Sequence, residues 1–213
     1  MPTKVSLLGA VCALALAGTA QAKGWYIGLE AGASSIADTG ADFRSTSAGL
    51  TTFVYDPVAR FDDGWAVIAT MGYALHGWRI EGELAWRSND KDQFTTPALP
   101  STGSLDALTA MYNMTYEFPL ADGLGVSVGG GAGLDYAMLD IAGLDDSDLN
   151  IAYQGIAGIN YAIGANTELT LAYRYLNVMD PEFEERSNPG IVIRFDDFAK
   201  HTLTLGLRYT YAP

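Results

Sequence analysis

The sequence is poor in cysteine, in basic residues and in long apolar runs. Its 213 residues include one cysteine, and 12 Lys and Arg stand against 25 Asp and Glu, which gives a formal net charge of -13. The shortage of basic residues disfavours nucleic-acid binding, because phosphate backbones are held by clusters of Lys and Arg. Hydrophobic residues make up 49% of the chain and charged residues 17%, a balance that argues against a disordered protein.

The first 22 residues have the organisation of an export signal. Lys4 supplies a positive charge, an apolar stretch follows, and Ala20-Gln21-Ala22 matches the small-x-small cleavage pattern. Because Cys12 lies inside this segment, the mature chain has no thiol for a disulfide, a metal site or a nucleophile. We therefore expect no cofactor, a cleaved signal over residues 1–22 and a single domain over residues 23–213.

Beyond the signal, large apolar residues alternate with polar or small ones. Residues 168–175 place leucines and tyrosines at odd positions and Glu, Thr, Ala and Arg at even positions. A period of two is typical of a strand with two unlike faces. Eight such segments occur, at approximately 24–34, 64–75, 77–88, 105–118, 124–136, 150–163, 168–177 and 201–211.

Long and short connections alternate between these segments. The short ones are 76–77, 119–123 and 164–167, and the long ones are 35–63, 89–104, 137–149 and 178–200. No apolar run reaches the roughly 18 residues of a second helical span, whereas each segment has the roughly ten residues that a tilted strand needs to cross a bilayer. The alternation of loop lengths is typical of outer-membrane barrels. The sequence therefore predicts an all-β fold, an eight-stranded antiparallel up-and-down transmembrane β-barrel.

Aromatic residues gather near both ends of the predicted strands. Amphipathic rings prefer the level of the lipid headgroups, with aliphatic side chains between them. We predict two aromatic girdles, which include Trp25, Trp65, Trp78, Trp86, Tyr173, Tyr175, Tyr209 and Tyr211. The alternative is a soluble exported sandwich or lipocalin-like barrel, which would bury the same aliphatic residues inside.

The alternate positions along the same strands, which face inward, carry charged residues inside the predicted barrel. We expect a lumen charge network that contains Glu30, Glu81, Glu83, Arg174 and Arg208. Barrel closure makes the first and last strands neighbours, so Glu30 and Arg208 are expected to pair directly. An interior of eight strands is about filled by its own side chains, and the paired charges should therefore plug it.

Several stretches carry a resemblance to a known family. They are residues 24–32, 71–84, 152–163, 169–175 and 201–209. These stretches look like the small outer-membrane β-barrel family that includes the OmpA transmembrane domain and opacity-type surface antigens. The resemblance covers nearly all of the mature chain and implies an eight-stranded barrel in the bacterial outer membrane. It includes no catalytic motif, so it implies fold and location rather than an activity.

Candidate ligand sites in the sequence have simpler structural interpretations. The glycine-rich run 129–133 lacks the spacing and the lysine of a phosphate-binding loop, and it reads as a strand whose inward glycines leave room for larger side chains across the lumen. Two acidic clusters lack calcium-loop spacing and read as solvated loops. Their members are Asp140, Asp145, Asp146 and Asp148 in one, and Asp180, Glu182, Glu184 and Glu185 in the other.

Two histidines test the idea of a lipid-modifying enzyme. His76 lies in a predicted periplasmic turn, whereas His201 lies at the external start of the last strand with outward parity. A base could act there, but Thr202 and Leu203 follow His201 where such deacylases carry a serine two residues after the histidine. We therefore expect no enzymatic activity and no metal site.

The expected function is a structural or surface-interaction role through the external loops, of the adhesin or surface-antigen type. The alternatives are a narrow porin-like channel and, less favoured, a lipid-modifying outer-membrane enzyme. Expected partners are outer-membrane lipids and lipopolysaccharide, the barrel-assembly machinery, and a host or cell-surface molecule bound by the loops.

Overall fold

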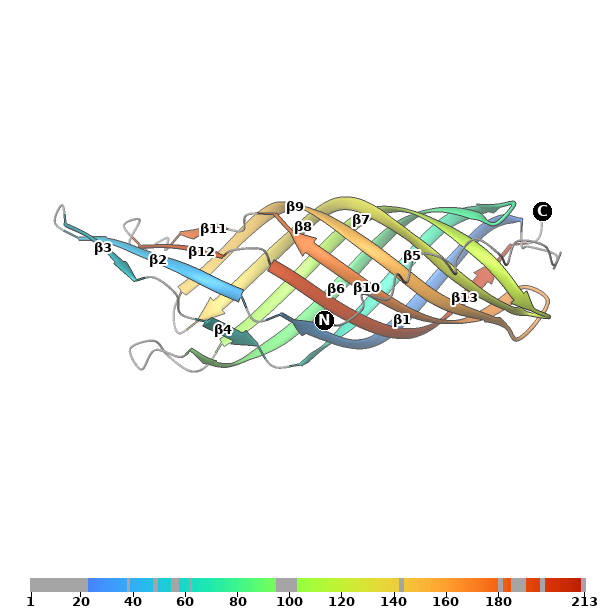
Figure 1. The fold of residues 1–213 in the computed structure, drawn as a ribbon, viewed down its shortest axis with the longest axis horizontal. Coiled ribbons are helices and arrows are strands. Elements are labelled where there is room, and N and C mark those ends of the chain that lie inside the picture. The colour runs from blue at the N-terminus through green and yellow to red at the C-terminus, as the bar shows by residue number, and fades with distance from the viewer. Residues whose placement is uncertain are drawn as a thin grey trace, which may run out of the picture.

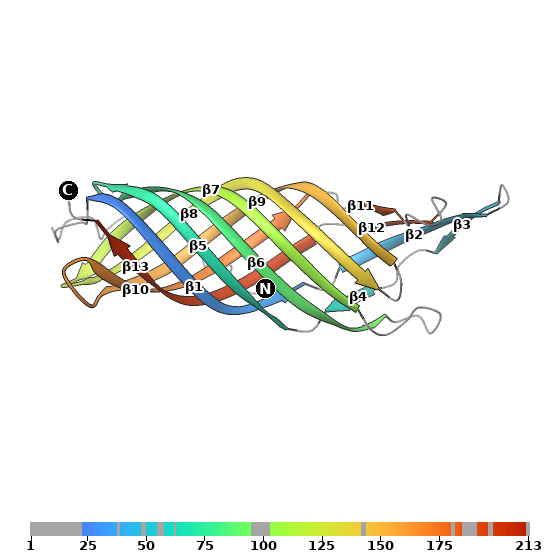
Figure 2. The same cartoon turned by 180° about the vertical axis from the view of Figure 1, so that it is seen from behind.

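Eight strands of the chain close into an antiparallel barrel (Figures 1 and 2). The computed structural model describes residues 23–37, 39–47, 50–54, 58–61, 63–94, 103–141, 144–179, 182–184, 191–195 and 198–211. The barrel strands are β1 (Gly24–Ile36), β5 (Gly64–Leu75), β6 (Trp78–Phe94), β7 (Gly103–Ala121), β8 (Leu124–Ile141), β9 (Leu144–Ala162), β10 (Thr167–Val178) and β13 (Phe198–Thr210). Each pairs with the barrel strand that precedes it and the one that follows it in the chain. β1 also pairs with β13 and closes the barrel, which confirms the predicted fold class.

The register of the eight strand pairs fixes how far the barrel is staggered. Cα partners traced from Tyr26 pass once around the barrel and return to β1 at Ile36, ten residues further along. The intermediate positions are Gly72, Glu81, Asn113, Gly131, Gln154, Leu176 and Lys200. Such a stagger is geometrically linked to a strand tilt of about 35–45°. A tilted strand needs about 9–11 residues to cross a bilayer, and every barrel strand is at least that long.

Tight turns join the strands at one end of the barrel. His76 and Gly77 both have positive φ, 50° and 85°, which suits a two-residue hairpin whose twist matches that of the flanking strands. Gly123, with φ of 73°, lies in the turn between β7 and β8. Residues 163–166 connect β9 with β10. The compact turns predicted at these three places are confirmed.

The strands continue further than the sequence suggested on the opposite side. β6 runs to Phe94 and β7 begins at Gly103, while β8 and β9 are separated by residues 142–143 alone. Within the predicted loop 89–104, residues 89–94 and 103–104 are strand, and within 137–149, residues 137–141 and 144–149 are strand, so the expectation was wrong at these positions. Beyond the membrane both faces of a strand can be polar, so the period-two pattern disappears although backbone pairing continues.

The other two long connections contain strands of their own. The strands are β2 (Thr39–Ser47), β3 (Leu50–Val54), β4 (Val58–Phe61), β11 (Glu182–Glu184) and β12 (Ile191–Phe195). β2 pairs with β3, β4 and β12, and β12 pairs with β11. Figure 1 shows β2, β3, β11 and β12 beyond the end of the barrel that is opposite the tight turns. We call these five strands the external sheet strands.

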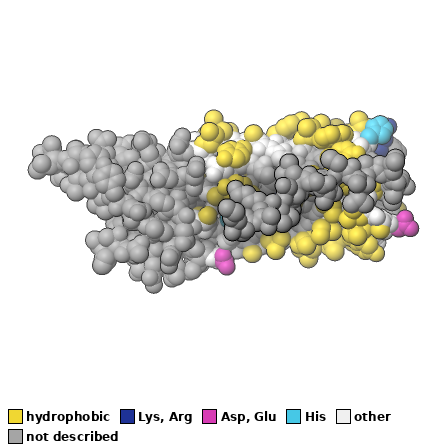
Figure 3. Space-filling view, in the orientation of Figure 1, with side chains coloured by type: hydrophobic (Ala, Val, Ile, Leu, Met, Phe, Trp, Pro, Cys, Tyr) yellow, Lys and Arg dark blue, Asp and Glu magenta, His cyan; other side chains and the backbone are white. Residues whose placement is uncertain are grey.

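Burial alternates along each barrel strand and separates two kinds of side chain. Polar and charged residues point inward, and buried examples include Glu30, Arg87 and Thr109. Most leucines, valines and aromatic residues point outward, and Leu29 and Met71 are both 62% exposed. Hydrophobic side chains cover the described wall of the barrel in Figure 3. An exposed apolar belt around a polar interior is the reverse of a soluble barrel and matches a barrel that faces lipid. Among the described residues, no helix has the length and apolar character of a membrane span.

The glycines of β8 adjoin β7 closely. A Cβ atom on Gly131 would overlap the side-chain oxygen of Asn113 and the backbone oxygen of Tyr112, both on β7. Gly129 and Gly133 are similarly crowded by β7 backbone atoms. These glycines were expected to make room for side chains across the lumen, but the crowding atoms belong to the adjacent strand. The close approach of two backbones is therefore what requires glycine here.

We predict that Gly131→Ala destabilises the folded barrel by about 1–3 kcal/mol, since overpacking forces backbone shifts. Gly155→Ala is the matched control, because a Cβ on Gly155 meets nothing within 4 Å. There the change should be neutral or stabilising by up to about 1 kcal/mol. Urea titrations of refolded protein in lipid vesicles measure both values. Equal effects of the two substitutions would contradict the close approach of β7 and β8.

Candidate functional site

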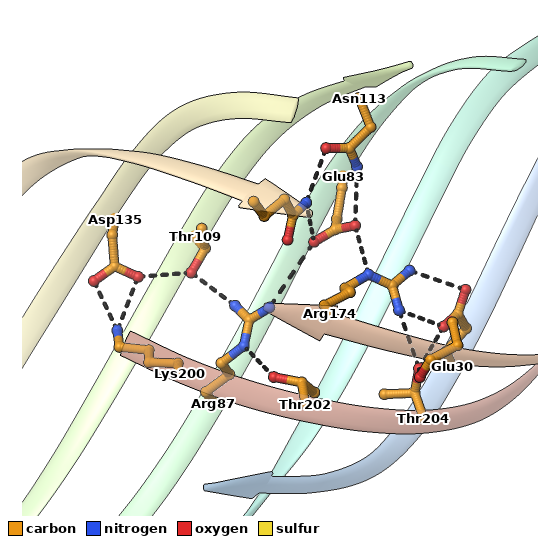
Figure 4. Close-up of polar contacts among 12 residues, drawn as sticks. Glu30, Glu83, Arg87, Thr109, Asn113, Asp135, Arg174, Lys200, Thr202 and Thr204 are labelled. Atoms are coloured by element: carbon orange, nitrogen blue, oxygen red, sulfur yellow. Dashed lines mark hydrogen bonds and ion pairs between the residues drawn. The ribbon is translucent and has the colours of Figure 1, made fainter. Parts of the chain in front are cut away.

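The middle of the barrel interior is organised around one guanidinium group. Arg174 on β10 donates from Nη1 to Glu30 Oε2 at 2.8 Å and from Nη2 to Glu30 Oε1 at 3.2 Å (Figure 4). Its Nε donates to Glu83 Oε2 at 3.0 Å. Thr204 Oγ1 also donates to Glu30, at 2.6 Å. A guanidinium presents its donors in a planar fork that matches carboxylates, and here the fork joins strands β1, β6 and β10 across the lumen.

Amide side chains complete the surroundings of Glu83. Asn113 Nδ2 donates to Glu83 Oε2 at 3.0 Å, and Gln154 Nε2 donates to Glu83 Oε1 at 3.3 Å. Gln154 also donates to Asn113 Oδ1 at 2.8 Å. The Glu83 carboxylate is thereby held from β7, β9 and β10 at once. Buried charges are tolerated when their remaining hydrogen-bonding positions are filled in this way.

A second group of charges lies toward the external end of the lumen. Lys200 Nζ contacts both carboxylate oxygens of Asp135, at 2.8 and 3.0 Å. Thr109 donates to Asp135 and accepts from Arg87, whose Nε donates to Thr202 at 3.1 Å. Arg87 lies 4.0 Å from Glu83, so the external and middle groups are connected (Figure 4).

A third group fills the lumen near the tight turns. Arg79 pairs with Glu117 and with Glu168, the latter at 2.9 Å, and Arg208 contacts Glu168 at 3.3 Å. The guanidinium of Arg208 lies 5.2 Å from the centre of the Tyr26 ring, within the range of a cation–π contact. All of these residues are buried or partly buried. The lumen therefore contains paired charges from its periplasmic end to its external end.

The structure places all five predicted lumen residues inside the barrel, but it changes one pairing. Glu30 contacts Arg174, whereas Arg208 contacts Glu168 and Asn160, so the expected direct pair of Glu30 with Arg208 was wrong. The register explains the change, because Glu30 lies opposite Gly206 and Arg208 lies opposite Gly28. Glu81 accepts from Tyr26 at 2.6 Å and from Asn113 at 3.4 Å.

Sequence reasoning missed several members of these groups. Lys200 was not assigned to the lumen because it lay in the predicted loop 178–200. Glu168 was not included because it was the first residue of the predicted segment 168–177. Tyr26 shares the even parity of Glu30, which was the available signal, but aromatic residues were expected to face lipid. Its ring is fully buried and hydrogen-bonded, as buried tyrosines usually are.

The predicted girdle residues all lie on the outside of the described barrel. Near the tight turns, aromatic rings pack edge to face with centroid distances of 4.9–5.4 Å. The pairs are Trp25–Tyr73, Trp78–Tyr116 and Tyr209–Tyr211. Toward the other end Trp65, Trp86, Tyr173 and Tyr175 are each more than a third exposed. Such rings can occupy the two membrane interfaces.

His201 belongs to a cluster on the outer wall. Its Nδ1 lies 2.7 Å from the Tyr173 hydroxyl, and the Tyr175 ring packs edge-on at 5.3 Å. Ser35 is its cross-strand partner on β1. No hydrogen bond joins Ser35 and His201 among the described residues, and none of the described carboxylates orients the imidazole. The arrangement therefore lacks the contacts of an activated serine.

The remaining candidate sites lie mostly outside the described side chains. Of the two acidic clusters, Asp148 alone is described, and it accepts from the backbone of Leu149 and the side chain of Asn150. The described part of the chain contains no group of three or more His, Cys, Asp or Glu that could hold a metal ion. The predicted signal, residues 1–22, also lies outside the described residues.

The closed barrel with an apolar outer belt and a charged, plugged lumen defines a β-barrel membrane protein of the bacterial outer membrane. The chain belongs to the family described as outer membrane protein beta-barrel domain, whose model matches residues 4–210. No curated protein matches the chain.

Solved structures of other small barrels share the fold. OprG from Pseudomonas aeruginosa is 16% identical, with 89% of this chain and 98% of that chain covered and a TM-score of 0.62. Neisserial surface protein A is also 16% identical, with 89% and 99% covered and a TM-score of 0.56. The outer membrane protein AlkL is 13% identical, with 93% and 95% covered and a TM-score of 0.52. At these identities the likeness concerns the fold alone.

We predict that Arg174→Met destabilises the barrel by about 3–5 kcal/mol, because it leaves the buried Glu30 carboxylate without its cation and removes the nearer of two cations from Glu83. In a double-mutant cycle, Arg174→Met and Glu30→Gln should couple by about 0.5–3 kcal/mol, since the two side chains are in contact. Urea titrations in which the folded fraction is measured from its gel mobility give the free energy of unfolding of each variant.

The matched control is the cycle of Glu30→Gln with Arg208→Met. These two residues make no direct contact in the structure, so their coupling should be weaker than that of Glu30 with Arg174. Strong coupling of Glu30 to Arg208 combined with additivity toward Arg174 would show that the lumen contacts are assigned wrongly.

Proposed function

We propose that the protein is a non-enzymatic outer-membrane anchor that binds a partner at the cell surface through its external sheet strands, in the manner of an adhesin or surface antigen. The observation that carries this proposal is the pairing of β2 with β12, from Ile191–Ser45 to Phe195–Ala41. This pairing joins the connection after β1 to the connection before β13. Two loops that are distant in the sequence thus form one structured surface outside the barrel.

The barrel fixes the positions at which the two paired connections begin. β1 and β13 are hydrogen-bonded neighbours over eleven Cα pairs, from Tyr26–Thr210 to Ile36–Lys200. The chain enters β2 from β1 and enters β13 from β12, so both halves of the external pairing start from adjacent points on a closed barrel. A binding surface on a rigid scaffold loses less conformational entropy on association than a free loop does.

The other functions are less well supported by the described side chains. A porin-like channel requires a continuous aqueous path, whereas paired charges occupy the lumen at three levels. A lipid-modifying enzyme requires an activated nucleophile, which the His201 cluster does not supply.

We further propose the partners that such a location implies. The barrel-assembly machinery would insert the chain, and outer-membrane lipids with lipopolysaccharide would surround the apolar belt. A host or cell-surface molecule would contact the external sheet. The signal over residues 1–22 would direct export before these steps.

Replacement of residues 39–61 by a short turn removes β2, β3 and β4 and tests the proposal. Bacteria that display the intact protein should be retained on arrays of immobilised glycans and proteins more strongly than cells without it. The shortened variant should lose that retention, because the external pairing is gone. Surface amount and gel mobility before and after boiling establish that the variant is displayed and folded.

The matched control shortens residues 95–102, the connection between β6 and β7, and should retain binding. Equal retention by the intact protein and the 39–61 variant would exclude this surface as the binding site. Equal retention by cells with and without the protein would exclude the adhesin-type function itself.

A further inference from the structure

A polar cluster interrupts the apolar outer wall near the external end of β10 and β13. His201 on β13 lies between Ser35 of β1 and Tyr175 of β10, which are its cross-strand partners on either side. Tyr173, two residues from Tyr175, approaches His201 Nδ1 to 2.7 Å. All four side chains are exposed or half-buried. We call these four residues the His201 cluster.

The cluster offers hydrogen-bond donors to its surroundings in either protonation state. When the imidazole is neutral and accepts at Nδ1 from Tyr173, its Nε2 carries the hydrogen and is a donor. When the imidazole is charged, Nδ1 donates to the Tyr173 oxygen, and the phenol hydrogen then points elsewhere as a second donor. The Ser35 hydroxyl, which has no hydrogen bond among the described residues, adds another. A group rich in acceptor oxygens would match this set.

The distribution of charge on the wall favours an anion at the same place. Among the described outward-facing side chains of the eight barrel strands, none is Lys or Arg, because the described cations of these strands lie in the lumen. The described carboxylates near the external ends, Asp63, Asp106 and Asp148, adjoin or belong to β5, β7 and β9. None lies on the outward faces of β1, β10 or β13. His201 is thus the one described basic side chain on the outward faces of the eight barrel strands, and no described carboxylate lies beside it to repel an anion.

The neighbours below the cluster suit acyl chains. Leu203 and Leu205 continue the outward face of β13 from His201 toward the membrane centre and are 52% and 54% exposed. Tyr173 and Tyr175 belong to the external aromatic girdle, the level at which amphipathic rings meet lipid headgroups. A lipid whose headgroup contacts His201 would therefore lay its chains along exposed leucines.

We propose that the His201 cluster binds the phosphate group of an outer-leaflet lipid, with His201 Nε2, Ser35 Oγ and Tyr173 Oη as donors. An ester carbonyl could accept from the same groups, but it lacks the negative charge that complements an imidazolium. The inference depends on the outer-membrane location of the barrel and is independent of whether the external sheet binds a partner.

Lipid retention measured by native mass spectrometry from a non-ionic detergent tests this proposal. Didodecanoyl phosphatidate should bind the refolded protein at least about fivefold more tightly than the diacylglycerol with the same chains. Tyr173→Phe keeps the ring, and His201→Gln keeps a polar group. Each should weaken phosphatidate binding by about fivefold, as expected for the loss of one hydrogen bond, and leave diacylglycerol binding unchanged.

Tyr153→Phe is the matched control, since Tyr153 is an exposed tyrosine on the outward face of β9, outside the cluster. Equal binding of the two lipids, or the same loss in Tyr153→Phe as in Tyr173→Phe, would overturn the proposal. Gel mobility before and after boiling verifies that each variant is folded.

Inorganic phosphate distinguishes a lipid headgroup from a free anion. Side-chain nitrogen shifts of the two histidines can be followed by NMR, with His76 in the opposite turn as an internal reference. A selective shift of His201 with phosphatidate, with or without a response to inorganic phosphate, supports the lipid site. A response to inorganic phosphate without one to phosphatidate would overturn it.

Discussion

The contact of Arg174 with Glu30 and Glu83 is the constraint on which the rest of the barrel interior depends. Three ionised groups meet where water has little access, and each carboxylate receives additional hydrogen bonds from Thr204 or from Asn113 and Gln154. A buried ion pair adds little net stability compared with apolar packing, but removal of one partner is costly. The network therefore favours one arrangement of strands, because a change of register would separate the Arg174 guanidinium from the Glu30 and Glu83 carboxylates.

Because successive side chains of a strand point to opposite faces, one alternating sequence forms both the polar lumen and the apolar outer wall. The residues that place Glu30 and Arg174 inside also place Leu29, Tyr173 and Tyr175 outside. Outward polar groups are then confined to positions that the membrane interface or solvent can reach, such as the His201 cluster. Beyond the membrane this constraint ends, and β8 and β9 continue to pair as far as Ile141 and Leu144. The same backbone pairing thus serves as a membrane wall and as the base of an external surface.

The number of strands, their order and their inward faces could be predicted from the sequence, because alternation and tight turns are local signals. The partner of each charge could not. Glu30 and Arg208 lie at similar distances from the strand ends, yet the stagger of the barrel brings Glu30 to Arg174 instead. The external strands were also missed, because pairing between β2 and β12 is a contact between distant segments that leaves no periodic pattern in either.

Electrical recording across planar bilayers tests most directly the central claim that paired side chains close the lumen. The refolded protein should give no conductance, or rare and small events, because eight strands enclose an interior that their own side chains about fill. Arg174→Met should leave this baseline nearly unchanged where the barrel still folds, since the Asp135–Lys200 and Arg79–Glu168 pairs remain in place. Large, stable current steps from the unmodified protein would contradict the account, because they require an open aqueous path through the lumen.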